Sequence, residues 1–434
     1  MAHGKPRASG RERMETSVTP RIAVVGLGIF MLFLRTSPAS ADKEGAAKES
    51  VVASSPCDRD PLRVILYPFL PAKDAYFRHV EADFEEHNPT IDLQVVDLSG
   101  NYYDESLPGA VTNTPADVIE LDSVFLDDFI GAGRVLALPR SWTRPSGTFL
   151  DVAQQAVVSN GTTYGVPHWV CSNFLFSRRG DSLNPATLHD LVTQLGNPHG
   201  ADQGLLIDLK GRSTLGEWYL DSLLDRYKTL AAASSHLSVS TADNAVYRDL
   251  KAVRQLCDSN LCRADEYHEM MGFYSAQFAR RRGRALAGYS ERLYYVGSEN
   301  LNDCRKGECV DLDEIKVNAL PLSDSGSHAF AWVDSFVVSK SCSDRCRRAA
   351  RAFVSYMSDP KNVRATLTPG YGEAPRYLLP ALQSLYSDRA LLAVAPHYST
   401  FLLLIVDSVP VRSPHLNRQL REIGGFIDRN VLLP

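Results

Sequence analysis

The sequence predicts an α/β protein with more than one domain. Three observations lead to this prediction: the length, a β-rich run followed by helical spacing, and the recurrence of that order. At about 150 residues per domain, 434 residues suggest two or three domains. The charged content of 22% and the hydrophobic content of 44% are typical of a soluble globular protein. The net charge of −5 gives no basic footprint, so nucleic acid is not an expected partner.

The elements of the first half alternate between strand and helix. In the segment 74–89, Tyr76, Val80 and Phe84 recur at helical spacing, and Asn88-Pro89 ends the helix. A second helix is expected over 123–139. Because strands and helices alternate, we expect a mostly parallel sheet covered by helices. The strands expected in this half are 62–71, 91–98 and 116–122.

The second half continues with both kinds of element. A turn and one long apolar strand are expected over 160–179, followed by a mixture of strands and helices. The tail from Leu378 is expected to be largely helical with proline breaks. The further strands are expected over 204–211, 284–289, 314–321 and 328–340, and the further helices over 213–227, 246–257, 273–283 and, as one long helix, 346–367.

The N-terminus predicts a secretory signal peptide over residues 1–41. Basic residues precede the apolar run IAVVGLGIFMLFL, and Ala39-Ser40-Ala41 follows as a cleavage site. We expect residues 42–59 to form a flexible leader and the protein to be secreted or periplasmic. An uncleaved membrane anchor is the alternative. No other apolar run is long enough to span a bilayer, so no membrane span is expected in the mature chain.

The cysteines agree with export to an oxidising compartment. Six of the eight lie in the close pairs CDSNLC, CRKGEC and CSDRC, which can close as disulfides, although spacing does not fix their connectivity. A zinc site is the alternative, but histidines at ligand spacing do not accompany the pairs. The other two are Cys57 in the leader and Cys171 in an apolar strand.

The order of several segments resembles a periplasmic solute-binding protein. These segments are LRVILYPF, ADVIELDSVFLDDFIGAGRVLALP, NGTTYGVPHWV and FLFSRRGD. The resemblance implies a two-lobed, periplasmic-binding-protein-like (type 2) fold, with mixed sheets flanked by helices and a cleft between the lobes. It places residues 60–165 and about 315–375 in lobe 1, and residues 166–314 and about 376–434 in lobe 2.

A narrower resemblance is to the thiaminase I (thiamine pyridinylase) family. It rests on VPHWVCSNFLFSRRGD, ELDSVFL, AGYSERL, VDSFVVS and YLLPA. It implies that Cys171 is a catalytic nucleophile and that Glu291 is a catalytic base. The sequence departs from the family in three respects: Trp332 stands where a tyrosine is expected, the segment FARRRGRALAGYSE is longer and more basic, and the cysteine pairs are additional.

The two catalytic candidates have other interpretations. A thiolate at Cys171 is well suited to attack an electron-poor aromatic carbon. Alternatively, Cys171 is a small buried hydrophobe, or it pairs with Cys57. Glu291 suits a base if it is partly buried and within hydrogen-bond reach of the thiol, or it merely complements a helix dipole. His168 ranks well below Glu291 as the thiol's partner, because side chains three apart on a strand face opposite ways.

The remaining site candidates are carboxylates and aromatic residues. Asp122 and Asp334 are expected at strand ends, where they face the crevice of an open α/β sheet; N-capping of the next helix is the alternative. Aromatic rings suit a flat cation through stacking and cation–π attraction, although aromatic residues in strands are more often core. The aromatic candidates are Tyr67, Tyr289, Trp332 and either Tyr102 or Tyr103.

The resemblance implies a secreted transferase that degrades thiamine by base exchange. Cys171 would attack the pyrimidine, the thiazole would leave, and an amine, pyridine or thiol would take the pyrimidinylmethyl group. No metal or organic cofactor is implied, and a monomer is expected. The alternative is an extracellular solute-binding protein for thiamine or a similar small molecule. A papain-like hydrolase is disfavoured, because its cysteine opens a helix.

Overall fold

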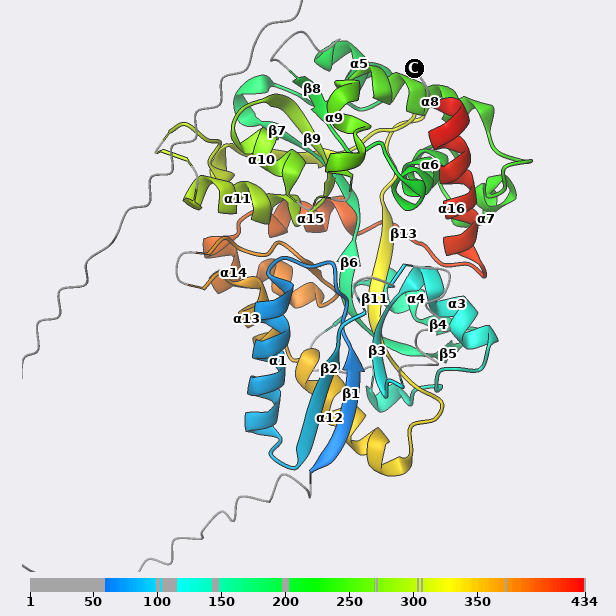
Figure 1. Cartoon of the computed structure of the whole chain (residues 1–434), viewed down its shortest axis with the longest axis vertical. Coiled ribbons are helices and arrows are strands. Elements are labelled where there is room, and N and C mark those ends of the chain that lie inside the picture. The colour runs from blue at the N-terminus through cyan, green and yellow to red at the C-terminus, as the bar shows by residue number, and fades with distance from the viewer. Residues whose placement is uncertain are drawn as a thin grey trace, which may run out of the picture. The chain divides into compact units, whose positions relative to one another are not determined.

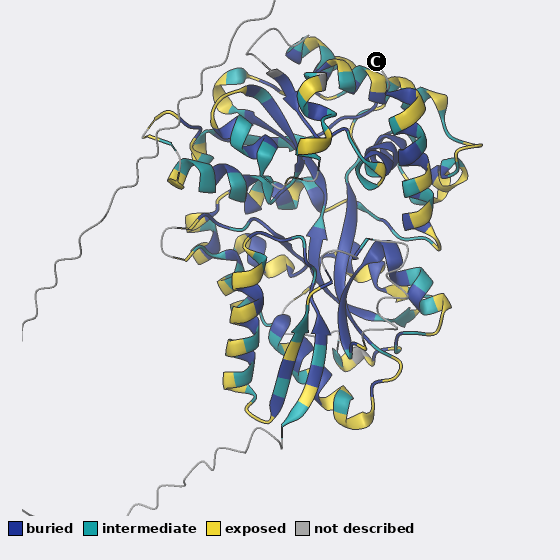
Figure 2. Ribbon diagram, viewed as in Figure 1, coloured by how far each residue is buried: buried dark blue, intermediate teal, exposed yellow. Residues whose placement is uncertain are grey.

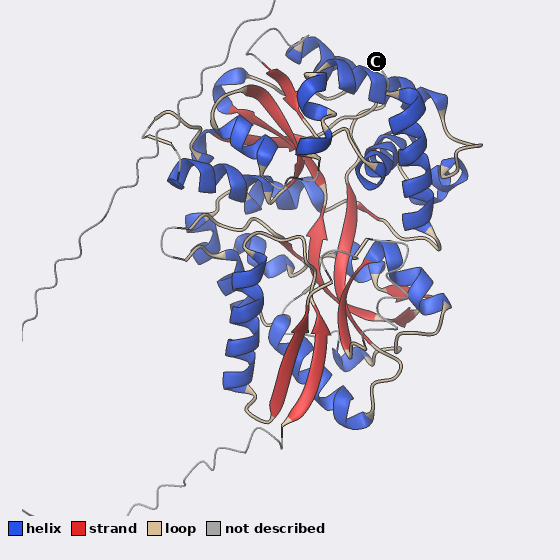
Figure 3. Ribbon diagram, viewed as in Figure 1, coloured by secondary structure: helices blue, strands red, loops and turns tan. Residues whose placement is uncertain are grey.

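The computed structural model describes residues 59–98, 102–103, 115–142, 148–196, 203–268, 270, 272–302, 304–305, 307–370 and 373–432. The predicted signal peptide, nearly all of the leader and Cys57 lie outside these residues. From Ser54 onward the chain forms one compact unit. Its described part contains two main sheets, each with helices packed against it (Figure 1; Figure 3).

The larger sheet has seven strands in the order β12-β6-β11-β3-β1-β2, with β13 paired to β11. β1 runs parallel to β2 and β3, as the alternation of strands and helices predicts. β11 runs antiparallel to both β3 and β6, so the sheet is mixed, as the resemblance to a solute-binding protein implies, and the mostly parallel sheet expected from the alternation of elements is wrong. The strands are β1 (Asp60–Ile65), β2 (Ile91–Val96), β3 (Val118–Asp122), β6 (Gly165–Cys171), β11 (Phe330–Val338), β12 (Leu379–Pro380) and β13 (Val409–Pro410).

The smaller sheet has four strands in the order β10-β7-β9-β8. β7 pairs antiparallel with both β9 and β10, and β8 runs parallel to β9. A separate two-stranded ribbon joins β4 (Val158–Ser159) to β5 (Thr162–Thr163). The strands of the smaller sheet are β7 (Asn173–Arg178), β8 (Gln203–Leu206), β9 (Gly283–Tyr289) and β10 (Ile315–Ala319).

We call the two sheets with their helices the large-sheet lobe and the small-sheet lobe. The chain passes from the first to the second between β6 and β7, and returns between β10 and β11. The strand pairing differs from the lobe limits expected from the sequence. β6, β12 and β13 were expected in lobe 2 but pair within the larger sheet, and β10 was expected in lobe 1 but pairs within the smaller one. The central strands β3, β6 and β11 are almost entirely buried, whereas β1 and β2 carry partly exposed residues and the outer helical faces are exposed (Figure 2).

The expected helices are present, although some differ in their bounds, and the sequence did not predict α4, α5, α7 and α9. Tyr76, Val80 and Phe84 form the buried stripe of α1, as their spacing predicts. The single helix expected over 346–367 is two helices, because Asp359 caps a new helix with Pro360 in its first turn. The helices are α1 (Lys73–His87), α3 (Ser123–Gly131), α4 (Asp151–Ala156), α5 (Leu188–Leu195), α6 (Arg212–Tyr227), α7 (Leu230–Ala233), α8 (Asn244–Gln255), α9 (Ser259–Cys262), α10 (Phe273–Ala279), α11 (Arg292–Asn302), α12 (Asp344–Met357), α13 (Pro360–Leu367), α14 (Arg389–Val394), α15 (Tyr398–Ile405) and α16 (Leu416–Phe426).

Two glycines allow α6 and α16 to pack backbone against backbone. A Cβ on Gly424 would lie 1.8 Å from the carbonyl oxygen of Arg212, and one on Gly216 would lie 2.2 Å from that of Leu420. Larger residues at either position would therefore force the helices apart. This crossing fixes α16 against α6, the helix that forms one wall of the cleft described below.

The three cysteine pairs close as Cys257–Cys262, Cys304–Cys309 and Cys342–Cys346. Because these six cysteines are bonded to one another, the zinc interpretation of the pairs is wrong. Among the described residues, Cys171 is the free cysteine. Within the described ranges, no three His, Cys, Asp or Glu side chains are grouped so as to hold a metal ion. Nor does this part of the chain contain a helix long and apolar enough to cross a membrane.

Candidate active site

A cleft of about 750 Å³ lies between the two lobes. Its wall on the large-sheet lobe comes from the ends of β1 and β3, the turn at 102–103 and β11. Its wall on the small-sheet lobe comes from α6, β9, α11 and α16. The predicted site residues that line it are Tyr67, Tyr102, Tyr103, Asp122, Tyr289, Glu291 and Trp332.

Cys171 is the last residue of β6, where the chain leaves the larger sheet. The long strand expected around it is two strands in different sheets. Cys171 is half-buried and is next to two residues that line the cleft. These are Trp332, its partner in register on β11, and Asn173, two residues further along the chain. Burial raises the pKa of Cys171 well above its usual range, and the charges of Asp334 and Glu291 raise it further.

Two carboxylates act on this thiol. The Sγ atom lies 3.8 Å from Oδ2 of Asp334, so Asp334 is the carboxylate within hydrogen-bond reach. Glu291, in the turn between β9 and α11, acts on the thiol as a nearby negative charge. Burial raises the pKa of Glu291 to about 7, and Arg292 opposes that rise. At neutral pH, Glu291 is therefore able both to accept and to release a proton.

Asp122 both caps a helix and faces the site. Its Oδ1 accepts a hydrogen bond from the Val124 N–H at 2.9 Å, which caps α3. Its Oδ2 accepts one from the Tyr103 hydroxyl at 2.7 Å. The N-cap interpretation is therefore confirmed, and Asp122 also lines the cleft. Burial raises the pKa of Asp122.

Asp334 lies in the middle of β11, so its expected position at a strand end is wrong. It pairs in register with Asp122, and the register with β6 shifts immediately after it. Such an irregularity re-aims side chains. Burial raises the pKa of Asp334 well above its usual range, and Asp122 and Glu120 raise it further. Its Oδ1 is buried without a hydrogen-bond partner in the described structure.

The neighbouring tyrosines Tyr102 and Tyr103 differ in the groups that their hydroxyls contact. Tyr102 is fully buried; its hydroxyl donates to the Glu120 carbonyl and accepts from the Asp122 N–H. Tyr103 instead donates to the Asp122 carboxylate at 2.7 Å, and its hydroxyl oxygen lies 3.3 Å from that of Tyr67. The choice left open by the sequence therefore falls on Tyr103 as the residue whose hydroxyl joins the site.

His168 pairs with the buried carboxylate of Glu120 rather than with the Cys171 thiol. Its Nδ1 lies 2.5 Å from Oε1 of Glu120, and both side chains are almost completely buried. The other oxygen, Oε2, accepts the Tyr67 N–H at 2.8 Å. This buried pair therefore fixes the backbone from which the Tyr67 ring projects.

Glu217, a cleft-lining carboxylate on α6, was not among the site residues predicted from the sequence. Its Oε1 accepts a hydrogen bond from Asn173 Nδ2 at 2.9 Å, and the Tyr289 hydroxyl also hydrogen-bonds to it. Burial raises the pKa of Glu217 to about 7. A signal was present: Glu217, Asp221 and Asp225 recur every four residues, which is one face of a helix that also carries many apolar residues.

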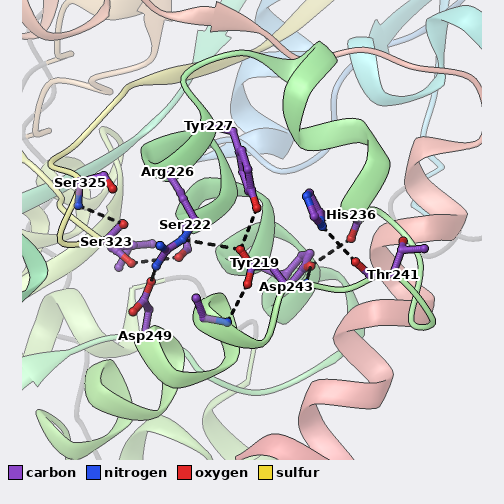
Figure 4. Close-up of polar contacts among 12 residues, drawn as sticks. Tyr219, Ser222, Arg226, Tyr227, His236, Thr241, Asp243, Asp249, Ser323 and Ser325 are labelled. Atoms are coloured by element: carbon purple, nitrogen blue, oxygen red, sulfur yellow. Dashed lines mark hydrogen bonds and ion pairs between the residues drawn. The ribbon is translucent and has the colours of Figure 1, made fainter.

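The far end of α6 is held by a polar network (Figure 4). The Tyr219 hydroxyl donates to the His236 carbonyl and accepts from the Asp243 N–H. Arg226 pairs with Asp249 at 2.7 Å. Together with the crossing by α16, this network makes α6 a fixed support for Glu217.

The fold and the cleft define a two-lobed protein of the solute-binding-protein-like class. An ABC transporter solute-binding protein from Agrobacterium radiobacter K84, in complex with ribitol, has a TM-score of 0.63 and 14% identity, and the match covers 87% of this chain and 96% of that one. The Clostridium botulinum thiaminase I in complex with thiamin has a TM-score of 0.72 and 22% identity over 86% of this chain and 100% of that one. At these identities the likeness concerns the fold alone.

Sequence comparison is more specific. No family model matches the chain. The Thiaminase-1 of Paenibacillus thiaminolyticus is 27% identical over 387 residues, which cover 86% of each chain. The protein is therefore a homologue of thiaminase I, which confirms the resemblance stated from its sequence motifs.

Proposed function

We propose that the protein is a thiaminase I that degrades thiamine by base exchange, with Cys171 as the nucleophile. The observation that carries the proposal is the free Cys171 among acidic side chains beneath an interlobe cleft, in a homologue of thiaminase I. A protein that only bound its ligand would not need a thiol there.

In the first half-reaction the Cys171 sulfur forms a bond to a carbon of the pyrimidine ring. Its proton passes through Glu291 to the ring. The bond between the methylene carbon and the thiazolium nitrogen then breaks, the electron pair goes to that nitrogen, and neutral thiazole leaves. Because the thiol pKa is raised, the proton must be removed as the sulfur attacks, which is the task of a general base.

The cleft chemistry supports a flat, cationic substrate. Among the residues that line the cleft, four carry carboxyl groups, Asp122, Asp208, Glu217 and Glu291, and two are arginines, Arg292 and Arg421. The rings of Tyr67, Tyr289 and Trp332 offer faces for stacking and for cation–π attraction to the thiazolium.

The unpartnered Oδ1 of Asp334 is suited to recognise the aminopyrimidine. A buried polar atom without a partner costs free energy, and a ligand that satisfies it recovers that cost. We assign Asp334 and Asp122 to binding the pyrimidine, with Tyr103 holding the Asp122 carboxylate. On this proposal the protein is secreted and acts without a metal or an organic cofactor.

The test is the intact mass of the purified protein after incubation with thiamine, with thiamine consumption followed in the same samples. We expect a mass increase of one pyrimidinylmethyl group on the wild type, none on Cys171→Ser, and turnover that requires added aniline or pyridine. Saturable thiamine binding without an adduct or turnover would instead identify a solute-binding protein, in which Cys171 has only a packing role.

A further inference from the structure

We propose that Glu217 is a second catalytic base, which takes the proton from the incoming nucleophile when that nucleophile is an amine or a thiol. The inference rests on the proposed function and assigns a role to a residue that the first half-reaction does not use. It follows from where Glu217 lies, what holds it and which proton is otherwise left without an acceptor.

Glu217 and Glu291 face the same cleft from different elements. Glu217 is on α6, whereas Glu291 follows β9, and both line the cleft together with Tyr289. Both carboxylates line the cleft, and the negative charge of each raises the pKa of the nearby Cys171 thiol, on which the covalent adduct forms. A nucleophile entering the cleft after the thiazole has left therefore meets two carboxylates.

The carboxylate of Glu217 is positioned on two sides. Asn173 donates to its Oε1 at 2.9 Å, and this same amide also donates to Asp221 at 3.2 Å. The Tyr289 hydroxyl contributes a further hydrogen bond. Because α6 is fixed by α16 and by the network around Tyr219, the carboxylate keeps its place while the substrates exchange.

The charge state of Glu217 suits the task. Burial raises its pKa to about 7, although the hydrogen bonds from Tyr289 and Asn173 lower it and so oppose the rise. A base with a pKa near the working pH is ionised in a large fraction of molecules and still holds a proton well. A glutamate on a solvent-exposed helix face would be a much weaker base.

The incoming nucleophile brings a proton that the first half-reaction does not account for, so a second base is needed. The proton that Glu291 moves belongs to the cysteine: it passes from sulfur to the ring and returns to sulfur when the adduct breaks down. An aniline or thiol brings a further proton of its own. In the second half-reaction, its lone pair forms the bond to the methylene carbon, its N–H or S–H proton passes to Glu217, and the electron pair of the ring carbon–sulfur bond returns to Cys171. Glu217 then releases the proton to water.

Pyridine provides an internal control, because its attacking nitrogen carries no proton. The experiment compares turnover of thiamine by wild type and Glu217→Gln with aniline and with pyridine. The exposed Glu86 on α1 offers a matched control, Glu86→Gln, outside the cleft. Adduct formation at Cys171 without added nucleophile is measured for each variant, since it reports the first half-reaction alone.

We expect Glu217→Gln to lose at least about 100-fold in turnover with aniline, the usual contribution of a general base, and to stay within about threefold of wild type with pyridine. Glu217→Asp should recover part of the aniline rate. An equal loss with both nucleophiles, or no loss with aniline, would overturn the role of Glu217. A wild-type protein that turns over thiamine with neither nucleophile would overturn the proposed function itself, a result distinct from either of these.

Discussion

Replacement of Glu291 by glutamine tests the proposed proton transfer from Cys171. Glutamine keeps the size of the side chain but cannot accept a proton, so the reaction must then start from thiolate already present. An ordinary cysteine, with a pKa of about 8.5, is roughly 3% ionised at pH 7. Burial and the neighbouring carboxylates raise the pKa of Cys171 well above its usual range, so its ionised fraction is smaller still.

In Glu291→Gln the rate of adduct formation at pH 7 should therefore fall at least about 30-fold. A larger loss, up to the 10²–10⁴-fold contribution usual for a general base, is also consistent with the assignment. The shape of the pH profile is more informative. In wild type, adduct formation should fall as the pH drops through about 7, where Glu291 becomes protonated. In Glu291→Gln it should instead rise about tenfold per pH unit between pH 7 and 9, because the thiolate fraction rises at that rate.

The assay is single-turnover formation of the Cys171 adduct, followed by intact mass from pH 5.5 to 9.5, with Glu86→Gln as the control. A Glu291→Gln profile within about threefold of wild type across this range would refute the assignment. If the steep profile appears only in Asp334→Asn, the proton passes to Asp334, the carboxylate that lies 3.8 Å from the thiol.

Three further outcomes follow from the packing and the buried charges. In Gly424→Ala the new Cβ would lie 1.8 Å from the α6 backbone, so this variant should lower the free energy of unfolding by about 1–3 kcal/mol or more in urea titrations. Gly131→Ala is the control, because a Cβ there would meet open space and should change the free energy of unfolding little. Glu120→Gln should weaken the buried contact with His168 and cost about 1–3 kcal/mol, measured in the same way, and an unchanged midpoint would contradict the assigned pairing. Burial raises the folded-state pKa of Glu217 and Glu291 to about 7, so the free energy of unfolding falls as the pH rises through 7. Calorimetry should therefore give a higher Tm at pH 6.5 than at pH 8.5. The opposite order would mean that these carboxylates are not buried as described.

Local patterns were sufficient for much of the fold and for the resemblance to thiaminase I. The stripe Tyr76, Val80 and Phe84 identified α1, since helical periodicity is a property of neighbouring residues. The close cysteine pairs anticipated the disulfides for the same reason. The motifs around Cys171 and Glu291 carried the resemblance to thiaminase I, which sequence comparison along the chain confirms.

Non-local pairing could not be obtained in this way. The apolar run through Cys171 looks continuous in sequence, but β6 pairs with β11 and β7 with β9, so the chain changes sheets directly after the cysteine. Hydrophobic periodicity indicates that a strand is buried without indicating its partner. For that reason the antiparallel β11, with Asp334 in its middle, was not foreseen.

The sequence by itself therefore determined the types of most local elements, the close pairing of six cysteines along the chain and the resemblance to thiaminase I, because each depends on side chains close together in the chain. The tertiary structure decided which carboxylates meet the thiol, that Tyr103 rather than Tyr102 presents its hydroxyl, and that Glu217 enters the cleft. These outcomes depend on burial and on contacts between segments far apart in the chain. Both the pKa of a carboxylate and the direction in which it points are set by those contacts.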